Sequence, residues 1–204
     1  DDDAVRGRPV DFHRLPGGEQ APHHRLAGRG GAQALHLRPD CTVVSFRGNV
    51  ATRLAKLQAD EADVTLLAAA GLQRLGETGV GTPLSEFEWL PAPAQGAIAI
   101  ETRDDDAEVQ TLCAVLDHAP TRTCVSAERA MNLALHGSCH VPVAAYASLE
   151  GDRLQLEGAV GSATDGTVVR AHGEGAAAVP AQLGTAVAQA LLEQGARDLI
   201  NAAV

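Results

Sequence analysis

Aromatic residues are scarce in this chain of 204 residues, which has one tryptophan, one tyrosine and three phenylalanines. Aliphatic side chains and alanine must therefore form most of the core, and an apolar content of 45% is enough for that. No run of about 18 apolar residues is present, so the sequence predicts no membrane span. A secretory signal pattern is also absent, and the four cysteines lack paired spacing. These absences favour reduced thiols in a cytoplasmic protein.

Positive charge is in short supply overall, because the formal net charge is −10, and this argues against a nucleic-acid partner. The charge is unevenly distributed, however. Residues 14–74 carry eight Lys or Arg side chains against five Asp or Glu side chains, whereas the rest of the chain has a net charge of −13. A basic region in an acidic protein suits a ligand rich in carboxylates, although any single arginine there is more often an ordinary surface residue.

The first half of the chain has the pattern of an α/β unit. The first 36 residues are rich in Gly and Pro and predict mostly loop, with a short helix near Gly31–Leu37. Cys41–Phe46 and Asp63–Ala70 are apolar enough to be buried strands, and between them Asn49 can cap a helix that runs to about Gln58. This order predicts a parallel pair of strands with a right-handed crossover, and ligands bound beyond their carboxyl ends.

The second half predicts a smaller α+β domain. Ala97–Glu101 is expected to be a strand and Asp104–Asp117 a helix, and Thr121 can cap the helix that follows. Three later segments alternate enough to form an antiparallel meander, and the end of the chain predicts one helix. The three strands are expected at Val141–Leu149, Arg153–Val160 and Thr167–His172, and the last helix at Pro180–Ala203.

One thiol is distinguished by its place in the chain. Glu128–Ala144, with the sequence ERAMNLALHGSCHVPVA, predicts the end of a helix, a tight loop and a strand that begins after Pro142. Cys139 is then held in the loop between two fixed elements. A lone cysteine is more often a small apolar filler, and a metal site formed with neighbouring histidines would lack a fourth ligand. We therefore predict no metal site.

The same segment resembles the region around the cofactor cysteine of the porphobilinogen deaminases, also called hydroxymethylbilane synthases. Other stretches are similar to the same family, and the resemblance runs from about Arg38 to the end of the chain. These stretches are Phe46–Leu57 (FRGNVATRLAKL), Ala70–Gly76 (AGLQRLG) and Leu90–Ala97 (LPAPAQGA).

The resemblance implies a fold of two α/β domains like those of periplasmic binding proteins, followed by an α+β domain that carries the cysteine. Residues 1–114 would belong to the second α/β domain and include a segment that returns to the first domain. Residues 115–120 would be the linker, and residues 121–204 the α+β domain. The family's first domain, which bears its catalytic aspartate, does not match this sequence. We therefore assign no catalytic residue and expect a truncated or diverged member.

The resemblance also implies an activity, in which four porphobilinogen molecules condense into linear hydroxymethylbilane and ammonia is released. The cofactor would be dipyrromethane, joined to Cys139 by a thioether. Arg29, Arg47, Arg53 and Arg74 are candidate ligands for the pyrrole carboxylates, since a guanidinium grips a carboxylate through two parallel hydrogen bonds. We expect a monomeric cytoplasmic enzyme with no membrane or nucleic-acid partner. The alternative is a non-catalytic remnant that binds anionic pyrroles at most.

Overall fold

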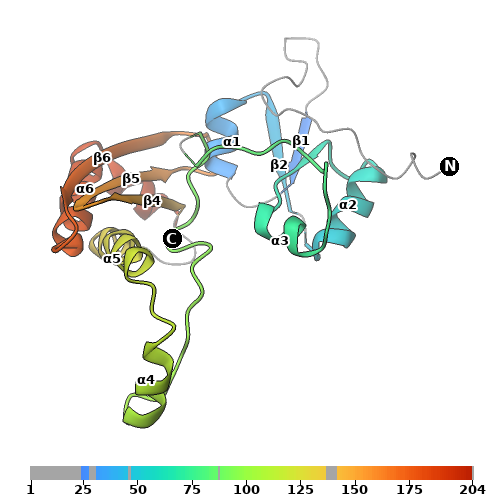
Figure 1. Ribbon diagram of the computed structural model, residues 1–204. Helices are drawn as coiled ribbons and strands as arrows, with labels where there is room; N and C mark the ends of the chain where they lie inside the picture. The colour runs from blue at the N-terminus through green and yellow to red at the C-terminus, as the bar shows by residue number, and fades with distance from the viewer. Residues whose placement is uncertain (1–23, 28–30, 46, 87, 137–141, 204) are drawn as a thin grey trace. The chain divides into compact units, whose positions relative to one another are not determined.

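The computed structural model describes residues 24–27, 31–45, 47–86, 88–136 and 142–203, which contain seven helices and six strands (Figure 1). Contacts divide the chain into two compact units. The first comprises Asp1–Trp89 and Gly161–Val168, and the second Leu90–Val160 and Val169–Val204. None of the described helices combines the length and the apolar character that crossing a membrane requires.

The first unit contains a parallel sheet of three strands in the order β2-β1-β3, together with three helices. The strands are β1 (His24–Ala27), β2 (Cys41–Val44) and β3 (Val64–Thr65), and the helices are α1 (Gly31–Leu37), α2 (Val50–Gln58) and α3 (Ala69–Arg74). Ala34 of α1 is fully buried and packs with Val43, Val64 and Trp89. This small core fixes α1 on the sheet.

The sequence predicted α1 and α2 correctly but missed the central strand. β1 lies between β2 and β3, with Leu26 opposite both Val43 and Val64, so the expected direct pairing of the two later strands is wrong. The four residues of β1 lie in a stretch of Gly and Pro where no period is visible, which is why no pattern pointed to them. The two predicted strands are also shorter than expected, and Ala69–Ala70 belongs to α3.

The second unit contains the three-stranded meander that the sequence predicted, in the order β4-β5-β6, with helices packed on it. The strands are β4 (Val143–Glu150), β5 (Arg153–Gly161) and β6 (Val168–Ala176), and the helices are α4 (Ala107–Ala114), α5 (Ala119–Ala134), α6 (Pro180–Glu193) and α7 (Ala196–Ala202). Its core is almost entirely aliphatic, as the shortage of aromatic residues required. Met131 of α5, Leu156 of β5 and Leu191 of α6 are among its fully buried members.

Two helix boundaries differ from the predictions for local reasons. α5 begins at Ala119 with His118 as its N-cap, and Thr121 bonds the His118 ring instead of capping the helix (Oγ1 to Nδ1, 2.8 Å). Pro120 suits the first turn, where its missing N–H is not needed. The predicted last helix is interrupted at Gly195, whose φ of +93° ends α6 and precedes α7.

The predicted strand at Ala97–Glu101 is absent. Ile98 is 80% exposed and Ile100 51% exposed, and no backbone hydrogen bond within the described chain joins residues 98–101 to a strand. An alternating pattern cannot form a strand without a neighbour that accepts and donates these bonds. Four further large apolar side chains are exposed in α4 and in the two residues that follow its last residue, Ala114. They are Val109, Leu112, Val115 and Leu116.

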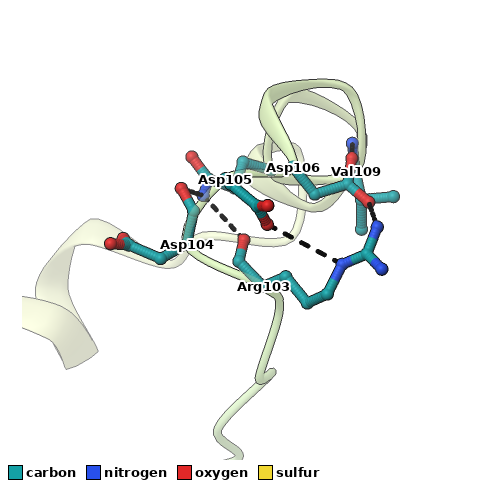
Figure 2. A network of polar contacts seen from close by, with 6 residues as sticks. Arg103, Asp104, Asp105, Asp106 and Val109 are labelled. Carbon is teal, nitrogen blue, oxygen red and sulfur yellow. Dashed lines mark hydrogen bonds and ion pairs between the residues drawn. The ribbon is translucent and has the colours of Figure 1, made fainter.

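The turn that precedes α4 is held by its own polar side chains (Figure 2). Asp106 caps the helix by accepting a hydrogen bond from the Val109 N–H (3.1 Å), and its other oxygen pairs with Arg103 at 3.2 Å. Arg103 also lies 3.8 Å from the Asp105 carboxylate. The helix is therefore shorter than the predicted Asp104–Asp117, because the aspartates form the turn and the cap.

Candidate functional site

The carboxyl edge of the sheet β2-β1-β3 is the place where the topology favours a ligand. The chain moves from β1 to β2 through α1, and then back across β1 to β3 through α2. Right-handed crossovers in opposite directions place α1 and α2 on opposite faces of the sheet, as Figure 1 shows. The direction reverses between β1 and β3, and ligands of open α/β sheets bind beyond the carboxyl ends of strands at such a point.

α2 begins at this edge, and its first turn is suited to binding an anion. The Asn49 Oδ1 accepts hydrogen bonds from the Thr52 N–H and the Thr52 hydroxyl, both at 2.9 Å, and so caps the helix as predicted. Gly48 has a φ of +132°, and a Cβ there would lie 2.7 Å from the Thr52 Cγ2. No acidic residue occupies the first turn of α2. The positive end of the helix dipole is therefore not neutralised by a carboxylate of its own turn.

Arg53 connects α2 to the end of β3. Its Nη1 donates a hydrogen bond to the carbonyl oxygen of Leu66, at 3.2 Å, immediately after β3. The side chain is partly buried. The structure thus places the guanidinium of Arg53 at the carboxyl edge of the sheet.

Arg47 and Arg74 are exposed, and neither forms an ion pair with any residue in the described parts of the chain. Arg47 follows β2 at the carboxyl edge, whereas Arg74 is the last residue of α3. The first turn of α2 approaches α3, because the Val50 Cγ2 lies 3.9 Å from the Cβ position of Gly71.

Three other cations of the basic region that the structure describes are held by neighbouring acids. Arg38 makes a two-pronged contact with Asp40, at 2.7 and 2.6 Å, which raises the pKa of Arg38. Arg25 pairs with Asp63 at 3.4 Å and Lys56 with Glu61 at 3.5 Å. Among the described cations of this region, Arg47 and Arg74 are therefore the ones for which no ion pair with a described acid is found.

Cys139 and Arg29 lie outside the described residues, so their roles stay predictions. The elements on either side of Cys139 are described: α5 ends at Ala134, the following Leu135 is buried, and β4 begins at Val143. No group of three His, Cys, Asp or Glu side chains in the described ranges is arranged to hold a metal ion.

Glu128 is a buried acid to which the sequence assigned no role. It is 6% exposed on α5, and its two oxygens accept hydrogen bonds from backbone N–H groups of two separate segments, at Ala94 and Ala147. Burial raises the pKa of the Glu128 carboxyl, and the two hydrogen bonds oppose that change. The sequence does contain a signal for this buried acid. Glu128 lies on the apolar side of the helix, one residue after Ala127 and three before Met131.

Comparison with known proteins decides the family. A family model described as "Porphobilinogen deaminase, dipyromethane cofactor binding domain" matches residues 26–111, and one described as "Porphobilinogen deaminase, C-terminal domain" matches residues 122–193. The chain belongs to the porphobilinogen deaminase family. The first match contains the arginines at positions 29, 47, 53 and 74, and the second contains Cys139 and Glu128.

Curated porphobilinogen deaminases of bacteria are similar to the chain over most of its length. The protein of Xanthomonas euvesicatoria is 55% identical over 170 residues, which are 83% of this chain and 56% of the relative. That of Xanthomonas oryzae is 55% identical over 172 residues, and that of Stenotrophomonas maltophilia 54% identical over 171 residues. The chain therefore spans little more than half the length of these porphobilinogen deaminases.

Proposed function

We propose that this chain takes part in hydroxymethylbilane synthase chemistry, the stepwise condensation of four porphobilinogen molecules into linear hydroxymethylbilane with release of ammonia. The observation that carries the proposal is the pair of family matches, which follow one another in the order of a cofactor-binding domain and a C-terminal domain. The names of the relatives support it. The reaction would serve tetrapyrrole and heme biosynthesis.

The residues at the carboxyl edge fit a ligand with several carboxylates. Arg53 already directs one N–H group to an oxygen there, the carbonyl of Leu66, and Arg47 has no acid that competes for it in the described chain. We propose that Arg29, Arg47, Arg53 and Arg74 bind acetate and propionate groups through charge-assisted hydrogen bonds. The N–H groups at the start of α2 would add to this positive field.

Dipyrromethane, bound through a thioether to the sulfur of Cys139, would supply the pyrrole carbon that is extended. The thiolate of Cys139 would be the nucleophile for attachment after its thiol loses the proton, and the new C–S bond would replace the bond between the pyrrole methylene carbon and its leaving group. The described residues at the carboxyl edge, 45, 47–49 and 66–68, include no carboxylate that could act as a general acid or base. We propose that this edge binds and orients, and we assign no catalytic residue within the chain.

The finer architecture and the setting belong to the same proposal. The α/β part would be half of a pair of domains like those of periplasmic binding proteins, with residues 115–120 as the linker to the α+β domain of residues 121–204. Support comes from residues 112–121, which separate the two family matches. We propose a monomer that acts on small molecules in the cytoplasm, without nucleic acid or membrane as partners, consistent with its net charge of −10.

The test uses the full chain, produced in cells that supply porphobilinogen, and its intact mass. The wild-type chain is expected to carry a covalent adduct of two pyrroles, and Cys139→Ser is expected to lack it. Cys113→Ser, on α4, is the matched control and should keep the adduct. A wild-type chain with no adduct would contradict the proposed cofactor.

A second measurement distinguishes an enzyme from a non-catalytic remnant. The remnant is the alternative because the chain matches only 56% of the length of a relative. Release of ammonia and formation of hydroxymethylbilane are followed with porphobilinogen as substrate. Turnover that depends on Cys139 supports the enzyme. An adduct without turnover supports the remnant that only binds anionic pyrroles.

A further inference from the structure

A long excursion of the chain in the second unit has no core of its own. Residues 95–118 form an arm that leaves the loop at Ala94, includes α4 and returns at the start of α5. None of these residues is buried. Their large apolar side chains are exposed, Ile98 to 80% and Leu112 to 66%, so side-chain packing does little to hold the arm in place.

Hydrogen bonds hold the arm only at its base. In the described chain, the bonds made by residues 98–116 reach at most seven residues along the sequence, as from the Gln110 side chain to the carbonyl oxygen of Arg103 at 3.0 Å. The last long-range bond before the arm is at Ala94, whose N–H donates to the Glu128 Oε2 at 2.6 Å. The freedom of the arm therefore depends on what Glu128 holds.

The other oxygen of Glu128 is bound to a firmly packed strand. Its Oε1 accepts a hydrogen bond from the Ala147 N–H at 2.9 Å. Ala147 is 5% exposed in β4, where it lies opposite Leu156 of β5, and Glu128 lies on α5 near the fully buried Met131. The carboxylate is thus anchored in the core through both α5 and β4, and Ala94 is its mobile partner.

The carboxylate also continues a contact that the loop before the arm begins. β4 is an edge strand of its sheet, and its outward N–H groups need acceptors. The Ala145 N–H donates to the carbonyl oxygen of Pro91 at 2.9 Å, and Glu128 serves the next outward N–H, that of Ala147. Beyond Pro91 the chain turns, with a φ of +61° at Ala94. Glu128 therefore replaces the carbonyl of a neighbouring strand and holds this turn at the same time.

We propose that Glu128 is the latch of the arm. With both hydrogen bonds in place, its carboxylate holds the turn at Ala94 beside β4, so the arm leaves the second unit at a fixed point. When the bond to Ala94 is lost, the turn is free to leave its left-handed conformation, and the arm moves from Pro91 onwards while α5 and β4 stay folded. The latch is a property of the fold and does not require the proposed function.

The experiment compares amide hydrogen exchange, followed by NMR, in the wild-type full chain and in Glu128→Gln. A glutamine keeps the size of the side chain but offers one acceptor oxygen in place of two, so one N–H donor loses its partner. The donor that is lost should be the mobile one, Ala94. Exchange of its amide is expected to accelerate by about tenfold or more, as for one hydrogen bond to a charged group.

Three other amides show where the latch acts. The amides of Ala147, Ala145 and Leu191 should keep their exchange rates in Glu128→Gln, since they belong to β4 and to the core of α6. Glu150→Gln, at the exposed end of β4, is the matched control and should change none of the four rates.

Two results would reject the latch. Faster exchange at Ala147 with an unchanged rate at Ala94 would show that the carboxylate serves the strand and not the arm. Acceleration at Leu191 equal to that at Ala94 would show that the whole unit opens, so that no local release of the arm takes place.

A measurement on the wild-type chain covers the case in which Glu128→Gln does not fold. The NMR order parameter should be about 0.85, as in rigid backbone, at Ala94 and below about 0.6 at residues 98–101. The Ala94 and Ala147 nitrogens should both show a coupling across the hydrogen bond to the Glu128 carboxylate carbon. A flexible Ala94, or a coupling at Ala147 alone, would mean that Glu128 does not hold the base of the arm, and the proposal would be wrong.

Discussion

A Cβ atom on Gly184 of α6 would lie 2.3 Å from the carbonyl oxygen of Ala127 on α5. It would also lie 2.8 Å from the backbone nitrogen of Met131. Backbone atoms inside a helix cannot turn aside as a flexible side chain can. The missing side chain at Gly184 is therefore what lets α5 and α6 meet, and α5 is the helix that leads to the cysteine segment.

Gly184→Ala is expected to destabilise the chain for this reason. Relief of the overlap requires α5 and α6 to separate, and overpacking of this kind costs about 1–3 kcal/mol. The free energy of unfolding in urea measures the effect. Gly175→Ala is the control, since a Cβ there would lie 3.4 Å from the Leu183 Cβ, an ordinary contact. Equal losses in both variants would contradict the explanation.

Ala94→Gly is expected to stabilise the chain. Ala94 has a φ of +61°, in the left-handed region that alanine avoids and glycine adopts freely. Relief of the strain, less the extra freedom of glycine in the unfolded chain, should add about 0.5–1 kcal/mol to the free energy of unfolding. Ala92→Gly, in the same loop but without a positive φ, should lower it instead. A loss in both variants would show that Ala94 is not strained.

Arg38 and Arg47 lie before and after the same strand, β2. Substitution of Arg38 should affect mainly stability, whereas substitution of Arg47 should affect mainly adduct formation. Arg38→Gln breaks the two-pronged contact with Asp40 and should cost about 1–3 kcal/mol of stability, without slowing adduct formation by the folded fraction. Arg47→Gln, at the carboxyl edge, should leave stability within about 0.5 kcal/mol. It should slow formation of the two-pyrrole adduct by about tenfold or more.

Urea unfolding and time-resolved intact mass measure these two properties for each variant. If Arg38→Gln slows the adduct as much as Arg47→Gln does, the ligand is not bound at the carboxyl edge. If Arg47→Gln unfolds the chain, the exposed side chain has a structural role that its surroundings do not show.

The buried carboxyl of Glu128 makes stability depend on pH. In the unfolded chain this group loses its proton near its usual pKa of 4.5, and in the folded chain burial raises the pKa above that value. Between these two pKa values the folded state binds more protons, so the free energy of unfolding falls as the pH rises. Relative to Glu128→Gln, the wild-type chain should lose stability as the pH rises from about 4.5, and then level off.

Urea unfolding of both chains across this range measures the difference, because other titrating groups cancel between them. A difference that does not vary with pH would show that the pKa of Glu128 is the same in the folded and unfolded chains.

Local chemistry explains which elements could be predicted. Asn49 caps α2 with its own side chain, and the apolar spacing at Leu183, Val187 and Leu191 selects the buried face of α6, since both signals act within one or two turns of the chain. The three strands of the meander follow one another closely enough that alternation alone indicated them. The residue string around Cys139 identified the family before any fold was known.

The tertiary structure decided what depends on distant partners. β1 becomes the central strand because β2 and β3 pair with it on either side. Nothing within its four residues indicates this central position. Ala97–Glu101 has the pattern of a strand but forms none, since backbone hydrogen bonds need a second strand.

Glu128 and the arginines also show which properties the sequence determined and which the tertiary structure decided. The sequence determined that a basic region and a displayed thiol exist in one chain. Only folding brought Asp63 to Arg25 and left Arg47 without an acid in the described chain, and only folding gave Glu128 its two N–H donors. Charge and pattern are properties of the chain itself, whereas pairing and burial depend on which groups the fold brings within a few ångströms of one another.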